Sequence, residues 1–123
     1  MGEKILVVDD DLEIQLALKG PLEAAGYVVD LCDNGKAVAE AVKNFKPDLL
    51  LLDVMLPGVD GLTLAMRLAE DDATCRLPIL VVSGLDTSEA LFSTLPQVKG
   101  FITKPFDTQA LVEKVRLALL PAV

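Results

Sequence analysis

Short apolar runs alternate along the chain with longer segments in which apolar residues recur at helical spacing. The short runs predict five strands, at Ile5–Val8, Tyr27–Cys32, Leu49–Leu52, Ile79–Val82 and Phe101–Thr103. The longer segments predict five helices, at Leu12–Ala25, Lys36–Phe45, Gly61–Glu70, Asp86–Leu95 and Asp107–Leu120. Strict alternation of strand and helix is typical of a parallel sheet that is covered by helices on both faces.

The composition of the strands predicts their order in the sheet. The first, third and fourth runs are apolar at every position, as central strands of a parallel sheet are. The second run contains Asp30 and the fifth is short, so both suit the edges. We therefore predict an α/β fold with a single doubly wound five-stranded parallel sheet of order 2-1-3-4-5, which is flavodoxin-like. One domain would occupy residues 1–123.

The first predicted helix contains an internal conflict at Gly20-Pro21. Proline has no N–H to donate, and its ring clashes with the preceding turn of a helix. We therefore expect a kink or an early end at this point. Gly26 follows the segment and is expected to terminate the helix.

Polar residues collect where the predicted strands end. Asp9 and Asp10 follow the first strand, Asp53 the third, Ser83 the fourth and Lys104 the fifth. Each alone is ordinary as a helix cap, a turn residue or a solvated side chain. The carboxyl ends of the strands meet at one edge, however, and three carboxylates brought together there repel one another. Such a cluster suits a hard divalent cation, and oxygen ligands without His or Cys point to Mg²⁺. A carboxylate beside Mg²⁺ and a lysine is also placed to accept a phosphoryl group.

The composition narrows the alternatives. The chain contains no histidine, which excludes Ser-His-Asp and Cys-His centres and His-ligated zinc. Its formal net charge of −8 argues against direct contact with nucleic acid. Apolar runs such as Leu49–Leu52 are far shorter than the ~20 residues that span a bilayer, so we expect no membrane segment. Two cysteines make no disulfide framework, which favours a cytoplasmic location.

Four segments, in this order, resemble the receiver domain of two-component response regulators. They are Ile5–Asp11, Pro47–Gly61, Ile79–Gly84 and Phe101–Phe106, and the resemblance covers essentially the whole chain. It implies a signalling domain rather than an enzyme, with self-phosphorylation and autodephosphorylation as its only chemistry.

The resemblance assigns a role to each residue at the strand ends. Asp53 would be the phosphoacceptor. Asp10 and Asp53 would ligate Mg²⁺ directly, together with the backbone carbonyl of Met55, while Asp9 would act largely through water. Lys104 would contact the phosphoryl group.

The resemblance also predicts a switch. Ser83 occupies the position of the switch hydroxyl, and Phe101 that of the aromatic residue that turns inward with it; a core role for Phe101 is the alternative. Gly84 would leave room for the phosphoryl group, and the peptide bond before Pro105 would be cis.

The partners that the resemblance implies are a sensor histidine kinase or a histidine phosphotransfer protein, in a two-component system or phosphorelay. The face formed by the fourth helix, fifth strand and fifth helix would signal output, to a partner or to a second copy in a homodimer. Leu91, Phe92 and Leu95 give the fourth helix an apolar surface. Because the last helix ends close to Val123, we expect no output domain within these residues.

Two alternatives stay open. The first is a haloacid-dehalogenase-like phosphotransferase with Asp9 as nucleophile and Asp11 as its acid/base partner. That reading leaves Asp53 and the loop Pro57–Gly61 unexplained, and Asp11 equally fits the N-cap of the first helix. The second is a receiver-like scaffold that binds partners without being phosphorylated.

Overall fold

A five-stranded parallel sheet forms the centre of the molecule. The structure is a computed structural model that describes residues 2–53, 55–56, 59–72, 74–83, 95–104 and 106–120. The strands are β1 (Lys4–Val8), β2 (Val28–Cys32), β3 (Leu49–Asp53), β6 (Ile79–Ser83) and β7 (Val98–Thr103), and they lie in the order β2-β1-β3-β6-β7. In chain order this is 2-1-3-4-5, so the predicted topology is confirmed.

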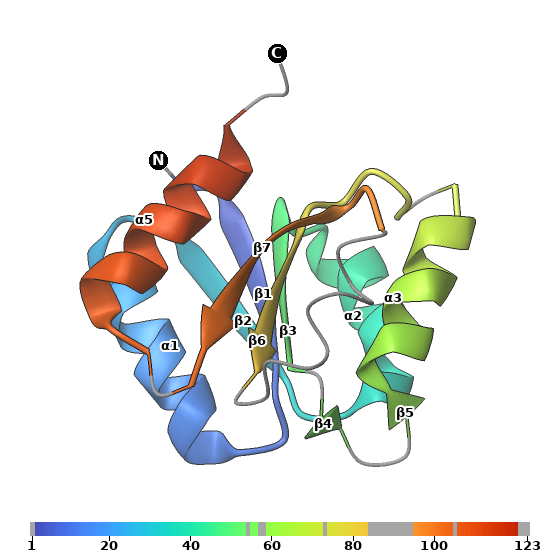
Figure 1. Ribbon diagram of the computed structural model, residues 1–123, viewed down its shortest axis with the longest axis horizontal. Coiled ribbons are helices and arrows are strands. Elements are labelled where there is room, and N and C mark those ends of the chain that lie inside the picture. Colours follow the sequence, from blue (N-terminus) through green and yellow to red (C-terminus); the bar gives the residue numbers. More distant parts are fainter. Residues whose placement is uncertain are drawn as a thin grey trace.

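Helices cover both faces of the sheet (Figure 1). α1 (Leu12–Ala24) and α5 (Thr108–Leu119) pack on one face, and α2 (Val38–Phe45) and α3 (Gly61–Glu70) on the other. The short 3₁₀ turn η1 (Gly35–Ala37) precedes α2, and the two-residue strands β4 (Met55–Leu56) and β5 (Val59–Asp60) pair between β3 and α3. The expected helix at Asp86–Leu95 lies almost wholly outside the described residues. Within the described ranges, no helix has the length and hydrophobicity needed to cross a bilayer.

The central strands bury both of their faces, as their uniform hydrophobicity predicts. Leu6 and Leu50 belong to a core beneath α2 and α3, whereas Val7 and Leu51 belong to a second core beneath α1 and α5. All four side chains are 0 % exposed. The sheet therefore sits between two apolar layers, and the ends of its strands are held in fixed relative positions.

Helix α1 continues through Pro21 to Ala24, so the expected early end is wrong. Pro21 still deprives the carbonyl of Ala17 of a hydrogen-bond donor. Gly20, however, carries no Cβ to clash with the proline ring, which removes one of the usual penalties before proline. Leu18 and Leu22, both buried, anchor the helix to the core on either side of the break in its ladder. Tertiary packing thus outweighs the local cost.

The end of α1 agrees with the prediction. Ala25 is the C-cap, and Gly26 follows it with a φ of +99°, a left-handed conformation that glycine adopts without steric cost. The turn brings the chain directly into β2, where Tyr27 donates its backbone N–H to the carbonyl of Leu22.

Candidate functional site

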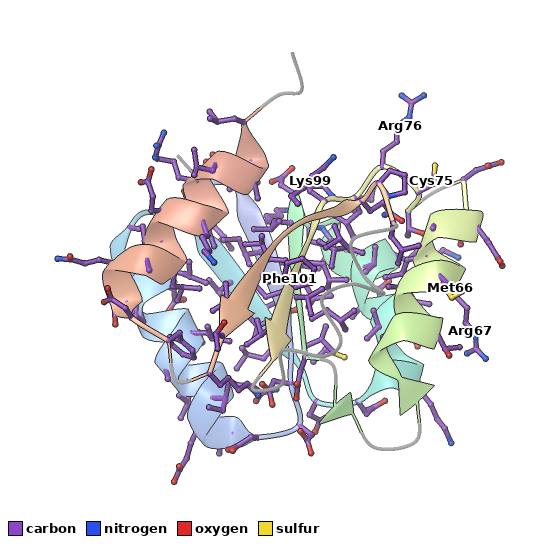
Figure 2. All side chains as sticks on the ribbon, in the orientation of Figure 1. Met66, Arg67, Cys75, Arg76, Lys99 and Phe101 are labelled. Carbon is purple, nitrogen blue, oxygen red and sulfur yellow. The ribbon has the colours of Figure 1, made fainter. Side chains whose placement is uncertain are left out.

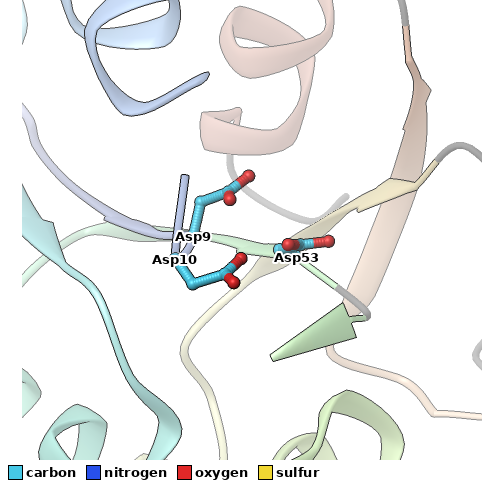
Figure 3. Close-up of side chains that lie close together, drawn as sticks. All are labelled: Asp9, Asp10 and Asp53. Carbon is cyan, nitrogen blue, oxygen red and sulfur yellow. The ribbon is translucent and has the colours of Figure 1, made fainter. Parts of the chain in front are cut away.

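Three carboxylates meet at the carboxyl ends of the two neighbouring strands β1 and β3. Asp9 and Asp10 follow β1 directly, and Asp53 is the last residue of β3. One oxygen atom of each lies within 4.8 Å of the others, and Figure 3 shows the three side chains side by side. Asp9 is 1 % and Asp53 4 % exposed, whereas Asp10 is exposed to solvent. The predicted clustering of these residues is therefore confirmed.

Lys104 brings a positive charge to the cluster from the far edge of the sheet. It follows β7, and its ammonium nitrogen lies 3.1 Å from Oδ2 of Asp9 and 3.6 Å from Oδ1 of Asp53. Burial lowers the pKa of Lys104, but the hydrogen bond to Asp9 and the charges of Asp53 and Asp9 outweigh it. The net result is a pKa above the usual value for lysine. The ammonium is therefore a permanent partner of both carboxylates near neutral pH.

Asp9 is held in place by the start of α1 as well as by Lys104. The backbone N–H of Asp11 donates to Oδ1 of Asp9 at 3.0 Å. The carboxylate of Asp11 in turn accepts from the N–H of Glu13 at 2.9 Å, which makes Asp11 the N-cap of α1. Both oxygens of Asp9 are thus engaged, and Asp11 is committed to the helix. This arrangement does not favour Asp9 as a nucleophile with Asp11 as its acid/base partner.

Gln15 is a residue of the site region that sequence reasoning missed. Its side chain is buried, and its Nε2 donates to the carbonyl of Asp9 at 2.7 Å and to the carbonyl of Cys32 at 3.2 Å. It therefore links α1 to the ends of β1 and β2.

The missed signal was the exact face of the helix. Leu12 and Leu16, which contributed to the apolar pattern, are 62 % and 54 % exposed. The buried row is Gln15, Leu18 and Leu22, at spacings of three and four residues. A polar residue in such a row is a candidate for a buried hydrogen-bonding role.

The remaining candidates lie where the strands end, but less of them is described. Ser83 is the last residue of β6, with its Cα paired to that of Thr103, and Met55 begins β4. The side chains of Ser83 and Met55 are outside the described residues, as are Gly84 and Pro105. Their predicted roles stay predictions.

Phe101 lies in β7 and packs, half-buried, against the core beneath α2 and α3 (Figure 2). This placement fits the core reading of Phe101 and is also compatible with a residue that moves between two packings. Its role as a switch stays a prediction.

The charges of the site are unbalanced. Three carboxylates face one ammonium, so the described side chains leave a surplus of negative charge in a partly buried space. The ligand atoms on offer are carboxylate oxygens, which suit Mg²⁺. The residues present therefore fit a magnesium ion. Asp10 is the carboxylate that solvent and a metal reach most readily.

Residues 5–116 match the family model described as the response regulator receiver domain. The chain belongs to this family. It is therefore the receiver of a response regulator, a signalling domain of two-component systems, and the haloacid-dehalogenase-like alternative is not favoured.

Two curated relatives of this receiver are named as regulators of transcription. It is 35% identical over 120 residues to the phosphate regulon transcriptional regulatory protein PhoB of Pseudomonas aeruginosa, a match that covers 97% of this chain and 52% of PhoB. It is 37% identical over 118 residues to the DNA-binding dual master transcriptional regulator RpaA of Synechocystis, covering 94% and 48%. The chain thus spans about half the length of these relatives.

Solved structures agree with the fold. A response regulator from Chloroflexus aurantiacus superposes with a TM-score of 0.90 at 32% identity, covering 97% of this receiver and 98% of that chain. The chemotaxis response regulator CheY4 of Vibrio cholerae gives a TM-score of 0.88, covering 96% and 99%, and at 21% identity it supports the fold alone.

The substitution Asp10→Asn tests the charge imbalance of the site. Without divalent metal we expect it to raise the free energy of unfolding by up to about 1 kcal/mol, the scale of an interaction between solvent-exposed charges, because it removes like-charge repulsion. Added Mg²⁺ should stabilise the wild-type chain and leave the variant nearly unchanged. Denaturant unfolding in EDTA and in Mg²⁺ measures both effects.

Asp72→Asn is the matched control, because Asp72 carries the same charge and is exposed beyond the far end of α3. It should change stability little, and the response to Mg²⁺ should remain that of the wild type. A loss of stability in EDTA for Asp10→Asn would contradict the charge argument.

Lys104 makes a pH-dependent contribution to stability. Because its pKa is raised in the folded chain, folding favours the protonated amine. The stabilisation is complete at neutral pH, below the pKa of an unfolded lysine, and is lost as the pH rises through the raised pKa. In EDTA, Lys104→Met should therefore be less stable than the wild type at neutral pH, and the gap should close in alkaline solution. Lys43→Met, at an exposed position on α2, should show no such closing gap in the same unfolding series.

Proposed function

We propose that this receiver, as one domain over residues 1–123, accepts a phosphoryl group on Asp53 from a sensor histidine kinase or a histidine phosphotransfer protein. The observation that carries the proposal is the position of Asp53. It lies at the end of a central strand, beside the acidic pair Asp9 and Asp10, with the ammonium of Lys104 3.6 Å from its Oδ1. Among the described residues, this is the place where a carboxylate, a fixed cation and a metal-binding pair coincide.

The surroundings of Asp9 support Asp53 as the acceptor. Asp9 receives hydrogen bonds on both carboxylate oxygens, one from the backbone of Asp11 and one from Lys104. A carboxylate fixed in this way is a better support for the site than a nucleophile.

The transfer forms one bond and breaks another. An oxygen of the Asp53 carboxylate attacks the phosphorus of a phosphohistidine on the donor protein, and an acyl phosphate forms as the N–P bond breaks. The donor imidazole leaves with the bonding electron pair and takes up a proton. Lys104 offsets the negative charge of the transferred group, and the hydroxyl of Ser83 donates a hydrogen bond to it.

Mg²⁺ would be held by Asp10, Asp53 and the backbone carbonyl of Met55, with Asp9 acting through water. When bound, it supplies further neutralisation of charge on the phosphoryl oxygens. The donor set of three carboxylates within 4.8 Å supports this part of the proposal.

Phosphorylation would change the output face through Ser83 and Phe101. The two residues lie on the adjacent paired strands β6 and β7. Movement of the Ser83 hydroxyl toward the phosphoryl group would bias Phe101 between two packings, which shifts the population of a two-state element.

The output face would include the described parts of β7 and α5. A groove of about 440 Å³ lies between them, and its lining includes Gly100, Phe101 and Lys114. Leu117 and Leu120 also line it and are 52 % and 53 % exposed. We assign this face to a second copy of the chain or to an output partner. Leu95 is half-buried three residues before β7, while Leu91 and Phe92 lie outside the described residues.

The cytoplasm is the location we propose for the chain. Cys32 and Cys75 are both free thiols, which suits a reducing compartment.

The phosphoacceptor is tested by incubating the chain with acetyl phosphate and Mg²⁺ and measuring its intact mass. We expect a single phosphoryl adduct on the wild type and none on Asp53→Asn, because the amide is not a nucleophile for this transfer. Asp48→Asn, at an exposed aspartate before β3, is the control and should keep the adduct.

Two other outcomes would overturn the proposal. Steady release of phosphate that depends on Asp9 and Asp11 would indicate a phosphotransferase of the haloacid-dehalogenase type. A wild-type chain that binds Mg²⁺ but forms no adduct with any phosphodonor would indicate a scaffold.

Association through the output face is tested by size-exclusion chromatography of the same samples. We expect the phosphorylated wild type to elute earlier than the unmodified chain, and Leu117→Glu to prevent this shift. Leu16→Glu, a similarly exposed leucine on α1, should leave the shift intact. Identical monomeric profiles for all samples would count against self-association.

A further inference from the structure

The side chain of Gln15 makes the connection between α1 and the acidic pair. It is 5 % exposed, and its single amide nitrogen uses two N–H groups on two backbone carbonyls, those of Asp9 and Cys32. The carbonyl of Cys32 also accepts from the backbone N–H of Asp9 at 3.1 Å. Gln15 therefore closes the sheet ladder just beyond the last paired residues, Val8 and Cys32.

The carbonyl of Asp9 controls the position of Asp10. It belongs to the planar peptide group that joins the two residues, so an oxygen fixed in space also fixes the backbone nitrogen of Asp10. The same plane contains the Cα of Asp10, so it fixes the point from which the Asp10 side chain leaves the backbone. Gln15 holds this oxygen at 2.7 Å, the shorter of its two bonds.

Asp10 depends on this backbone restraint more than its neighbours do. Asp9 is fixed through its carboxylate by Asp11 and Lys104, and Asp53 is fixed by β3 and Lys104. Asp10 is exposed, and within the described part of the chain its carboxylate makes no ion pair and no side-chain hydrogen bond. The peptide plane before it is thus its main restraint.

We propose that Gln15 is a positioning residue for the metal site, which aims the Asp10 carboxylate by fixing the carbonyl of Asp9. The inference rests on the proposed function in one respect, namely that the acidic cluster binds Mg²⁺. Gln15 does not touch the metal or the phosphoryl group. It acts through the peptide that joins Asp9 and Asp10.

Gln97 offers a matched comparison within the same chain. It is also 5 % exposed, and its Nε2 donates to two backbone carbonyls, those of Thr74 at 2.7 Å and Leu77 at 2.8 Å. It lies just before β7, at the amino end of the sheet, whereas Gln15 lies at the carboxyl end. The two glutamines therefore have the same kind of structural role at opposite ends of the strands.

The experiment compares Gln15→Met with Gln97→Met, because methionine keeps the length of the side chain and removes both donors. Each variant should lose stability in EDTA, since buried carbonyls lose a partner. Isothermal titration with Mg²⁺ alone should give a dissociation constant about tenfold higher for Gln15→Met, at the lower end of the effect of residues that orient metal ligands. Gln97→Met should bind Mg²⁺ as the wild type does.

The remaining outcomes overturn the inference. Wild-type affinity in Gln15→Met would reduce Gln15 to a structural residue, and equal weakening in both variants would indicate general loosening of the fold. If the wild type binds no Mg²⁺, the metal part of the proposed function fails first and the inference with it. Should Gln15→Met not fold, Gln15→Asn and Gln97→Asn take the place of the pair, with the same expected contrast, because the shorter amide cannot reach both carbonyls.

Discussion

Electrostatic repulsion at one edge of the sheet is the constraint on which the rest of this structure depends. The parallel arrangement brings the carboxyl ends of β1 and β3 together, and with them three carboxylates whose oxygens approach within 4.8 Å. Such a group is unfavourable unless it is compensated. Lys104 provides part of the compensation, and it reaches the cluster because β7 ends at the same edge. The fold therefore holds together a site whose excess negative charge favours the binding of a cation.

The two apolar layers compensate for the repulsion among the three carboxylates. Central strands that are completely buried on both faces hold the strand ends in register, so the carboxylates cannot move apart. Hydrogen bonds then fix the details: Asp11 caps α1 and donates to Asp9, while Gln15 ties the end of β1 to that of β2. The apolar layers stabilise the fold, and repulsion within the acidic cluster at the edge destabilises it, as is common at functional sites.

Both the order of the sheet and the acidic cluster can be predicted from the sequence. Uniformly apolar strands predict the centre of the sheet, Asp30 predicts an edge, and the rule that ligands bind at strand ends brings Asp9, Asp10 and Asp53 together. Gln15 escaped this reasoning because a polar residue interrupts an apolar helical row, and its two partners are backbone atoms that leave no mark in the sequence. The course of α1 through Pro21 was also beyond local rules, since packing of the neighbouring leucines decides it.

The ion pairs of Lys104 couple β7, an edge strand, to the acidic cluster. This strand pairs with β6 alone in the described sheet, so it can shift without breaking a second ladder. Lys104 directly follows the last residue of this strand, and its ammonium extends past β6 to Asp9 and Asp53. Any change of charge on Asp53 alters the electrostatic attraction between Asp53 and Lys104. Phe101, in β7, lies only three residues before Lys104. One of the two edge strands of the sheet is therefore joined by ion pairs to the most highly charged point of the sheet.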